Sequence, residues 1–133
     1  MEHARGSFDV KLTQQPMALN AAADALGRLS IEKQFHGDLE ATSRGEMLTA
    51  TTDLKGSAGY VAVERVSGTL RGRQGTFALQ HSGTMTRGAP QLTVTVVPDS
   101  GTGQLTGLSG KMAITIADGK HSYDFEYMLA AIP

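Results

Sequence analysis

Apolar and polar residues alternate in two stretches between Tyr60 and Met85, and together these stretches predict one antiparallel β-hairpin. If the chain reverses at Gly72–Arg73, Glu64 lies directly opposite His81. Alternation then places both ionisable side chains on the same face as the apolar residues Tyr60, Ala62, Val66, Phe77, Leu79 and Met85. A carboxylate and an imidazole on an apolar face must bond to each other or to a ligand. This pair is therefore the first candidate for a functional site.

The same alternation recurs along most of the chain and predicts further short strands. The first covers Gly6–Thr13 and ends near Pro16, because proline cannot donate a hydrogen bond to a continuing ladder. A second covers Leu29–Glu40, and after a turn near Ser43–Gly45 the chain returns over Glu46–Thr52.

The final hairpin is the clearest local prediction. Met112–Ala117 and Lys120–Leu129 flank Asp118–Gly119, a dipeptide typical of two-residue hairpin turns. Pairing around this turn places three pairs opposite each other: Ile114 with Tyr123, Met112 with Phe125, and Lys111 with Glu126. The last pair carries opposite charges on the outer face, which supports this register.

One stretch, residues 17–27, is rich in helix formers, and a short helix and an irregular linker are equal alternatives there. With a further alternating strand at Gln91–Pro98, the chain has seven to nine short strands joined mostly by hairpins, and its sixteen glycines suit tight turns. These features predict an all-β fold, a small antiparallel β-barrel of about eight strands, with a two-sheet sandwich as the alternative. The length predicts a single domain over residues 1–133.

Composition narrows the classes of partner. Twelve Lys and Arg residues against thirteen Asp and Glu leave no basic excess, so nucleic acid is not an expected partner. No apolar run approaches the ~20 residues that span a bilayer, and the first residues lack the apolar core of a signal peptide, so we expect a cytoplasmic protein without membrane contact. The chain has no cysteine, which leaves carboxylates, imidazoles and hydroxyls to carry any chemistry, and no cofactor is expected.

Four sequence blocks resemble a known family: ERVSGTLRGRQGTFALQHSGTM, VVPDSGTGQLTGLSGK, FHGDLEATSRGEML and HSYDFEYML. They cover most of residues 35–129, and their order and spacing are similar to those of the bacterial proteins grouped as domain of unknown function 3224. The resemblance implies a barrel similar in architecture to plant allene oxide cyclase, with an enclosed cavity, and no established function. The family pattern has larger aromatic residues where this chain has Val66 and Val94, which implies a roomier cavity if either position lines the lumen.

The resemblance also carries a binding role to Glu46, which stands in a matching block beside the candidates Glu64 and His81. A metal site needs three converging ligands. Only these three residues are placed to meet, and no closely spaced histidine motif accompanies them, so no metal site is predicted.

The other histidines are weaker candidates. His3 is expected to be exposed in a flexible terminus, and His36 falls on the polar side of its strand. His121 follows the last turn, faces Ile116 and is placed to cap one end of the barrel.

Three functions stay open. In the first, the lumen holds a small, mainly apolar molecule whose polar end is oriented by Glu64 and His81, and its predicted lining consists of Tyr60, Val66, Phe77, Leu79 and Tyr123. In the second, the same cavity guides a cofactor-free cyclisation or isomerisation, with Glu64 or His81 as catalytic residue that transfers a proton. The third is a packed barrel that acts through its outer surface, as a homo-oligomer or a partner platform. A purely structural role for the pair is an equal alternative to binding.

Overall fold

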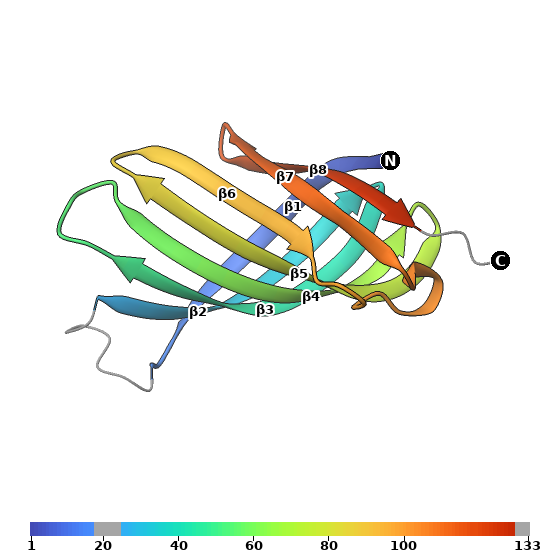
Figure 1. Cartoon of the computed structure of the whole chain (residues 1–133), viewed down its shortest axis with the longest axis horizontal. Coiled ribbons are helices and arrows are strands. Elements are labelled where there is room, and N and C mark those ends of the chain that lie inside the picture. Colours follow the sequence, from blue (N-terminus) through green and yellow to red (C-terminus); the bar gives the residue numbers. More distant parts are fainter. Residues whose placement is uncertain (18–24, 130–133) are drawn as a thin grey trace.

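The structure is a computed structural model that describes residues 1–17 and 25–129. Eight β-strands form a closed antiparallel barrel in which sequence neighbours pair and β1 pairs with β8 (Figure 1). The strands are β1 (Glu2–Gln15), β2 (Leu26–Gly37), β3 (Leu39–Thr51), β4 (Ala58–Leu70), β5 (Arg73–Thr86), β6 (Ala89–Val96), β7 (Leu108–Ala117) and β8 (Lys120–Leu129). The predicted all-β barrel is confirmed, and the sandwich alternative is wrong.

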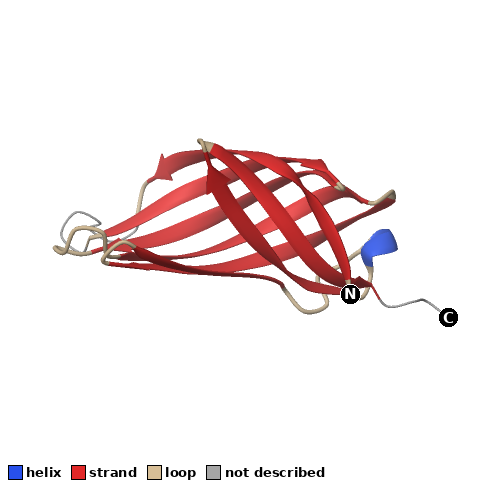
Figure 2. Ribbon diagram, turned by 90° about the horizontal axis from the view of Figure 1, so that it is seen from above, coloured by secondary structure: helices blue, strands red, loops and turns tan. Residues whose placement is uncertain are grey.

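The barrel has two distinct ends. The β3–β4, β5–β6 and β7–β8 connections lie at one end, which we call the mouth end (Figure 1). The opposite end, where β1 begins and β8 ends, is the terminal end. A single 3₁₀ turn, η1 (Gly103–Leu105), lies near the terminal end (Figure 2). Across residues 1–17 and 25–129, no helix has the length and apolar character needed to cross a membrane.

Three hairpin turns share one sequence pattern, in which glycine is the second of two residues that both have positive φ. They are Arg71–Gly72, Arg87–Gly88 and Asp118–Gly119. Positive φ at both central residues defines the type I′ turn, whose twist matches that of the flanking strands. The predicted turn at Asp118–Gly119 is confirmed, and so is its register, including the Lys111–Glu126 pair.

The central hairpin turns one residue earlier than predicted, at Arg71–Gly72. The observed pairs are Leu70 with Arg73, Val66 with Phe77, Glu64 with Leu79, and Ala62 with His81. The predicted direct pairing of Glu64 with His81 is therefore wrong. The physical reason is that a type I′ turn favours glycine at its second position, whereas reversal at Gly72–Arg73 would put arginine there. Because the register shifts by two residues on one strand, every side chain keeps its predicted face.

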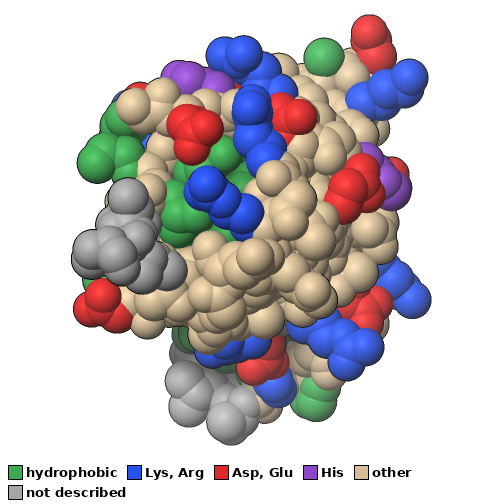
Figure 3. Space-filling model, turned by 90° about the vertical axis from the view of Figure 1, so that its right-hand side faces the viewer, with side chains coloured by type: hydrophobic (Ala, Val, Ile, Leu, Met, Phe, Trp, Pro, Cys, Tyr) green, Lys and Arg blue, Asp and Glu red, His purple; other side chains and the backbone are tan. Residues whose placement is uncertain are grey.

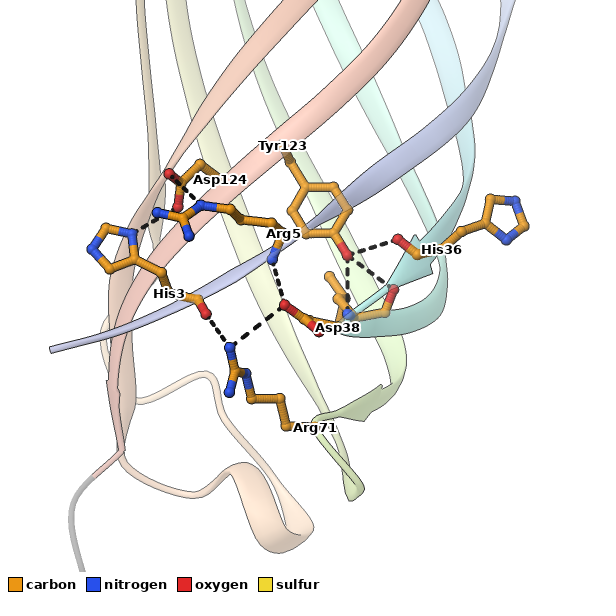
Figure 4. Close-up of polar contacts among 8 residues, drawn as sticks. His3, Arg5, His36, Asp38, Arg71, Tyr123 and Asp124 are labelled. Atoms are coloured by element: carbon orange, nitrogen blue, oxygen red, sulfur yellow. Dashed lines mark hydrogen bonds and ion pairs between the residues drawn. The ribbon is translucent and has the colours of Figure 1, made fainter.

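The turn between β2 and β3 lies at Gly37–Asp38, and the predicted turn near Ser43–Gly45 is wrong, because those residues lie inside β3. Gly37 has a φ of +105°, which L side chains rarely adopt. The hydroxyl of Tyr123 on β8 donates to the His36 carbonyl at 2.8 Å and accepts from the Leu39 amide at 2.9 Å (Figure 4). A contact with a distant strand thus fixes this turn.

Two predictions near the start of the chain also need correction. The first strand is longer than Gly6–Thr13, so His3 lies in β1 and not in a flexible terminus. The alternative helix at 17–27 falls mainly on residues 18–24, which lie outside the described residues, while Leu26 and Gly27 belong to β2.

A packed core fills the lumen from the middle of the barrel to the terminal end. The rings of Phe77 and Phe125 stack at 5.8 Å between centroids, and those of Phe125 and Tyr127 at 5.3 Å. The core also includes Phe8, Phe35, Leu39, Val66, Leu70, Leu79, Val94, Leu108, Met112 and Tyr123. Four residues predicted to line a ligand cavity therefore lie in this packed region: Val66, Phe77, Leu79 and Tyr123.

The junction between β6 and β7 is the least paired in the barrel. Thr95 and Lys111 form its single register pair, whereas the β4–β5 junction pairs from Ala58 with Met85 to Leu70 with Arg73. A groove of about 350 Å³ lies over this junction. The barrel closes here mainly through side-chain packing, because the ladder of backbone hydrogen bonds is short.

Candidate functional site

On the inner face, the paired residues of β3, β4, β5 and β6 form rows around the barrel. The row nearest the mouth end is Thr51, Ala58, Met85 and Pro90. From there inward, the next three rows are Thr49, Tyr60, Gly83 and Leu92; then Met47, Ala62, His81 and Val94; then Gly45, Glu64, Leu79 and Val96. Glu64 and His81 lie in adjacent rows on neighbouring strands and so meet diagonally. The Nε2 atom of His81 is 2.6 Å from Oε2 of Glu64, and their side chains are 5% and 0% exposed. The predicted contact and burial of the pair are therefore confirmed.

Two further side chains complete the site. Lys33 of β2 donates from Nζ to Oε2 of Glu64 at 2.8 Å, and Ser43 of β3 donates from Oγ to Oε1 at 2.8 Å. Four consecutive strands thus contribute one polar side chain each, and we call Lys33, Ser43, Glu64 and His81 the Glu64 cluster. In the described part of the chain, every fully buried side-chain nitrogen or oxygen has a hydrogen-bond partner.

Small and aromatic neighbours make room for these charges. A Cβ atom on Gly45 would lie 2.1 Å from the Val63 carbonyl oxygen and 2.6 Å from the Cα of Glu64, so β3 and β4 can approach this closely only at a glycine. The ammonium of Lys33 lies 4.9 Å from the ring centroid of Phe8 and 5.7 Å from that of Phe35. These rings stabilise the buried cation in addition to Glu64.

The cluster keeps Glu64 ionised. Burial acts to raise the pKa of Glu64, but hydrogen bonds from His81 and Lys33 and the charge of Lys33 outweigh it and lower the pKa from 4.5 to about 2. Because an ionised carboxylate only accepts hydrogen bonds, the Nε2 atom of His81 carries the shared proton. In neutral His81 the Nδ1 atom is then an acceptor. No described residue is hydrogen-bonded to this atom.

A cavity of about 460 Å³ opens at the mouth end. Its inward-facing lining consists of Thr49, Thr51, Ala58, Tyr60, Gly83, Met85, Pro90 and Leu92. The ring of Tyr60 lies against Gly83, where a Cβ atom would be 2.4 Å from the ring's Cε1. Burial and the charge of Glu64 raise the pKa of Tyr60, so its hydroxyl stays protonated at neutral pH. The row that contains Tyr60 adjoins the row that contains His81, which brings the mouth cavity next to the cluster.

Glu46 does not join the cluster. Its pairing with Val63 places it on the outer face, where it accepts a hydrogen bond from Nε of Arg28 at 2.7 Å. The expectation that Glu46 meets Glu64 and His81 is therefore wrong, because Glu46 and Glu64 lie on opposite faces of adjacent strands. Among the predicted ligand-binding residues, Tyr60 is the one that lines the mouth cavity.

Lys33 and Ser43 were not among the predicted site residues. Lys33 occupies the inward position between Ile31 and Phe35, so it interrupts an apolar series in the same way as Glu64 does between Ala62 and Val66. This ionisable residue in an otherwise apolar inward series was sufficient to identify Lys33 from the sequence. Ser43 fell within the misplaced turn, and alternation identifies it only after the β2–β3 turn is known.

His3 and His36 lie on the outer face of the barrel, whereas His121 lies on the inner face, where its ring centroid is 5.1 Å from that of Phe8. His3 donates from Nδ1 to Asp124 at 2.8 Å, and Arg5 donates to the same carboxylate at 3.1 Å (Figure 4). His36 is exposed as predicted, and His121 pairs with Ile116 as predicted. Across the described ranges, no group of three or more His, Asp and Glu residues is placed to hold a metal ion.

A small cavity of about 160 Å³ lies at the terminal end, lined by Glu2, Leu70, Arg71, Arg73, Tyr127 and Leu129. Figure 3 faces this end and shows charged side chains of both signs around an apolar area. Arg71 contributes to the rim by bonding the His3 carbonyl and pairing with Asp38 at 3.5 Å (Figure 4). The charged rim and the low volume make this end a poorer site for an apolar ligand than the mouth.

Fold and site together define a small closed antiparallel β-barrel with a buried ionic cluster beneath an apolar mouth cavity. The model of the family described as "Protein of unknown function (DUF3224)" matches residues 4–127. The chain belongs to this family, as its sequence blocks predicted.

A solved structure supports the same assignment. The crystal structure of a protein with unknown function from the DUF3224 family of Shewanella oneidensis MR-1, at 1.84 Å resolution, is similar with a TM-score of 0.94. Its sequence is 51% identical, and the alignment covers 99% of this chain and 99% of that chain. No match was found among curated proteins.

Proposed function

We propose that this protein binds a small, mainly apolar molecule in the mouth cavity, with the polar end of that molecule directed toward His81. The observation that carries the proposal is the apolar cavity of about 460 Å³ directly beside the row of His81. This volume is in the range of small-molecule sites, which are mostly apolar with a few polar groups that fix orientation.

The state of His81 suggests the chemistry of the polar end. Its Nε2–H group is committed to Glu64, while Nδ1 has no partner among the described residues. In the neutral form of the imidazole, Nδ1 is therefore one free acceptor in the row next to the mouth cavity. A ligand with a single hydroxyl or amide N–H group at the end of an apolar body fits this arrangement, provided that the Tyr60 ring moves aside.

A cyclase or isomerase that uses Glu64 as a base is less well supported. A carboxylate with a pKa of about 2 is a weak base at neutral pH, and the Glu64 side chain is fully buried among its three hydrogen-bond donors. His81 is the better candidate for proton transfer, because its Nδ1 atom is uncommitted. The binding hypothesis needs no such transfer.

Native mass spectrometry of the purified protein, followed by titration with the apolar dye Nile red, tests the proposal. We expect a copurified compound or saturable dye binding in the parent protein. Gly83→Ala should weaken dye binding by about tenfold or more, because the new methyl group pushes the Tyr60 ring into the cavity. Ser82→Ala, on the outer face of the same strand, is the matched control and should bind like the parent.

His81→Gln separates the binding role from the structural one. Glutamine keeps an N–H donor near Glu64 but removes the acceptor at the position of Nδ1. We expect thermal stability close to that of the parent and weaker binding of hydroxylated apolar compounds. Absence of both copurified compound and saturable dye binding in the parent, or undiminished binding in Gly83→Ala, would overturn the proposal.

A further inference from the structure

Three neighbouring aliphatic side chains interrupt the polar outer surface of the barrel. Leu48 of β3 pairs with Val61 of β4, and Val63 is the next outward residue of β4. Their exposed fractions are 49%, 53% and 55%. We call these three residues the outer apolar patch. Apart from Leu26 at the start of β2, the other outward positions of β2–β5 carry polar or small side chains, such as Arg44, Arg65, Ser67, Gln80 and Ser82.

The sequence of β4 supports a covered outer face at this place. From Tyr60 to Val63 the strand is apolar on both faces, with Tyr60 and Ala62 inward and Val61 and Val63 outward. Strands that are apolar on both faces are typically buried on both sides. Beyond Val63 the outward residues of β4 are the polar Arg65, Ser67 and Thr69, so the exception is local to the patch.

The patch lies in a shallow groove of about 760 Å³ with a rim of both charges. Arg28 and Glu46 form an ion pair on one side of the groove, and Gln80 and Ser82 lie on the other. A rim with one positive and one negative group is self-complementary. A partner with surface charge of a single sign would meet attraction from one of these groups and repulsion from the other.

We infer that a second copy of this chain covers the outer apolar patch in a two-fold symmetric dimer. In such an interface both copies contribute the same surface. Arg28 of one protomer therefore faces the partner's Glu46, and by symmetry Glu46 of the first protomer faces the partner's Arg28. Two sheet faces then pack with aliphatic side chains between them, as in a β-sandwich. The interface is on the opposite face of β4 from the mouth cavity, so it stands independently of the proposed ligand.

Sedimentation velocity over a range of protein concentrations tests the dimer. We expect concentration-dependent dimerisation in the parent. The double variant Val61→Thr/Val63→Thr keeps side-chain shape and strand preference while making the patch polar, and should raise the dimer dissociation constant by at least about tenfold. Ser67→Glu, outward on the same strand beyond the patch, is the control and should dimerise like the parent. Circular dichroism verifies that each variant is folded.

A charge-swap experiment tests the predicted contact across the two-fold axis. Arg28→Glu alone and Glu46→Arg alone should each dimerise weakly, because like charges then face each other in the homodimer. An equimolar mixture of the two variants should form a heterodimer, in which each facing pair has opposite charges. A parent protein that is monomeric at every concentration, an unchanged dissociation constant in the threonine variant, or a mixture that does not associate would overturn the inference.

Discussion

At the scale of single residues, the Glu64 cluster depends on one carboxylate that neutralises a buried lysine. Replacing Glu64 with glutamine leaves Lys33, whose side chain is 6% exposed, without a counter-charge. Removing one partner of a buried ion pair costs about 3–5 kcal/mol. We therefore expect Glu64→Gln to lower the free energy of unfolding by this amount in urea titrations.

Glu46→Gln is the matched control for this prediction, since Glu46 lies on the neighbouring strand and pairs with Arg28 at the surface. An exposed ion pair contributes less than about 1 kcal/mol, so the control should unfold nearly like the parent. Equal stability of Glu64→Gln and the parent would contradict the assignment of Glu64 as the partner that Lys33 requires. The double variant Lys33→Met/Glu64→Gln should recover part of the loss, because no unpaired charge stays buried.

The lowered pKa of Glu64 also predicts how stability depends on pH. Glu64 titrates near 4.5 in the unfolded chain and near 2 in the folded protein, so its contribution is fully present above pH 4.5 and is lost as pH falls toward 2. A shift of this size corresponds to about 3 kcal/mol. Urea titrations between pH 7 and pH 2 should show this loss in the parent and a flatter profile in Glu64→Gln. Parallel profiles would contradict the assignment.

At the scale of strands, Gly45 decides how closely β3 and β4 approach beside the cluster. In Gly45→Ala the new methyl group meets the backbone of β4, which cannot rotate away as a side chain could. We expect a loss of about 1–3 kcal/mol or more, because two strands must separate. Gly59→Ala is the control, since the nearest atom to a Cβ there is 3.7 Å away. Alanine also suits a strand better than glycine, so this variant should be neutral or slightly more stable. Thermal unfolding of both variants measures the difference, and equal effects would count against the close approach.

The same strands explain what the sequence predicts and what it does not. Which face a side chain occupies follows from alternation with period two, so Glu64 and His81 were placed inside correctly even though their register was wrong. Register depends on the turn, and Arg71–Gly72 differs from Gly72–Arg73 only in where glycine stands in a type I′ turn. The position of the β2–β3 turn could not be predicted from the local sequence pattern, because the contact that fixes it comes from Tyr123, more than eighty residues away in the chain. Ser43 was missed for that reason.

At the scale of the whole molecule, the barrel is closed unevenly. Long hydrogen-bonded ladders join β2 to β3, β3 to β4 and β4 to β5, whereas β6 and β7 form the single register pair of Thr95 and Lys111. Backbone groups that lack a partner on a neighbouring strand open to solvent at little cost, and such junctions are the first to separate in local unfolding. The junction between β6 and β7 should therefore be the least protected part of the sheet.

Amide hydrogen exchange measured by NMR tests this prediction residue by residue. In an antiparallel strand, alternate amides point to opposite neighbours, so β6 should show two classes. Amides that donate to β5 should be protected, while those that face β7 should exchange faster by orders of magnitude, and amides of β4 and β5 should exchange slowest. Protection of β6 and β7 equal to that of β4 and β5 would contradict the open junction. Fast exchange of these amides would mean that β6 and β7 can separate without breaking the Glu64 cluster, since all four residues of the cluster lie on β2–β5.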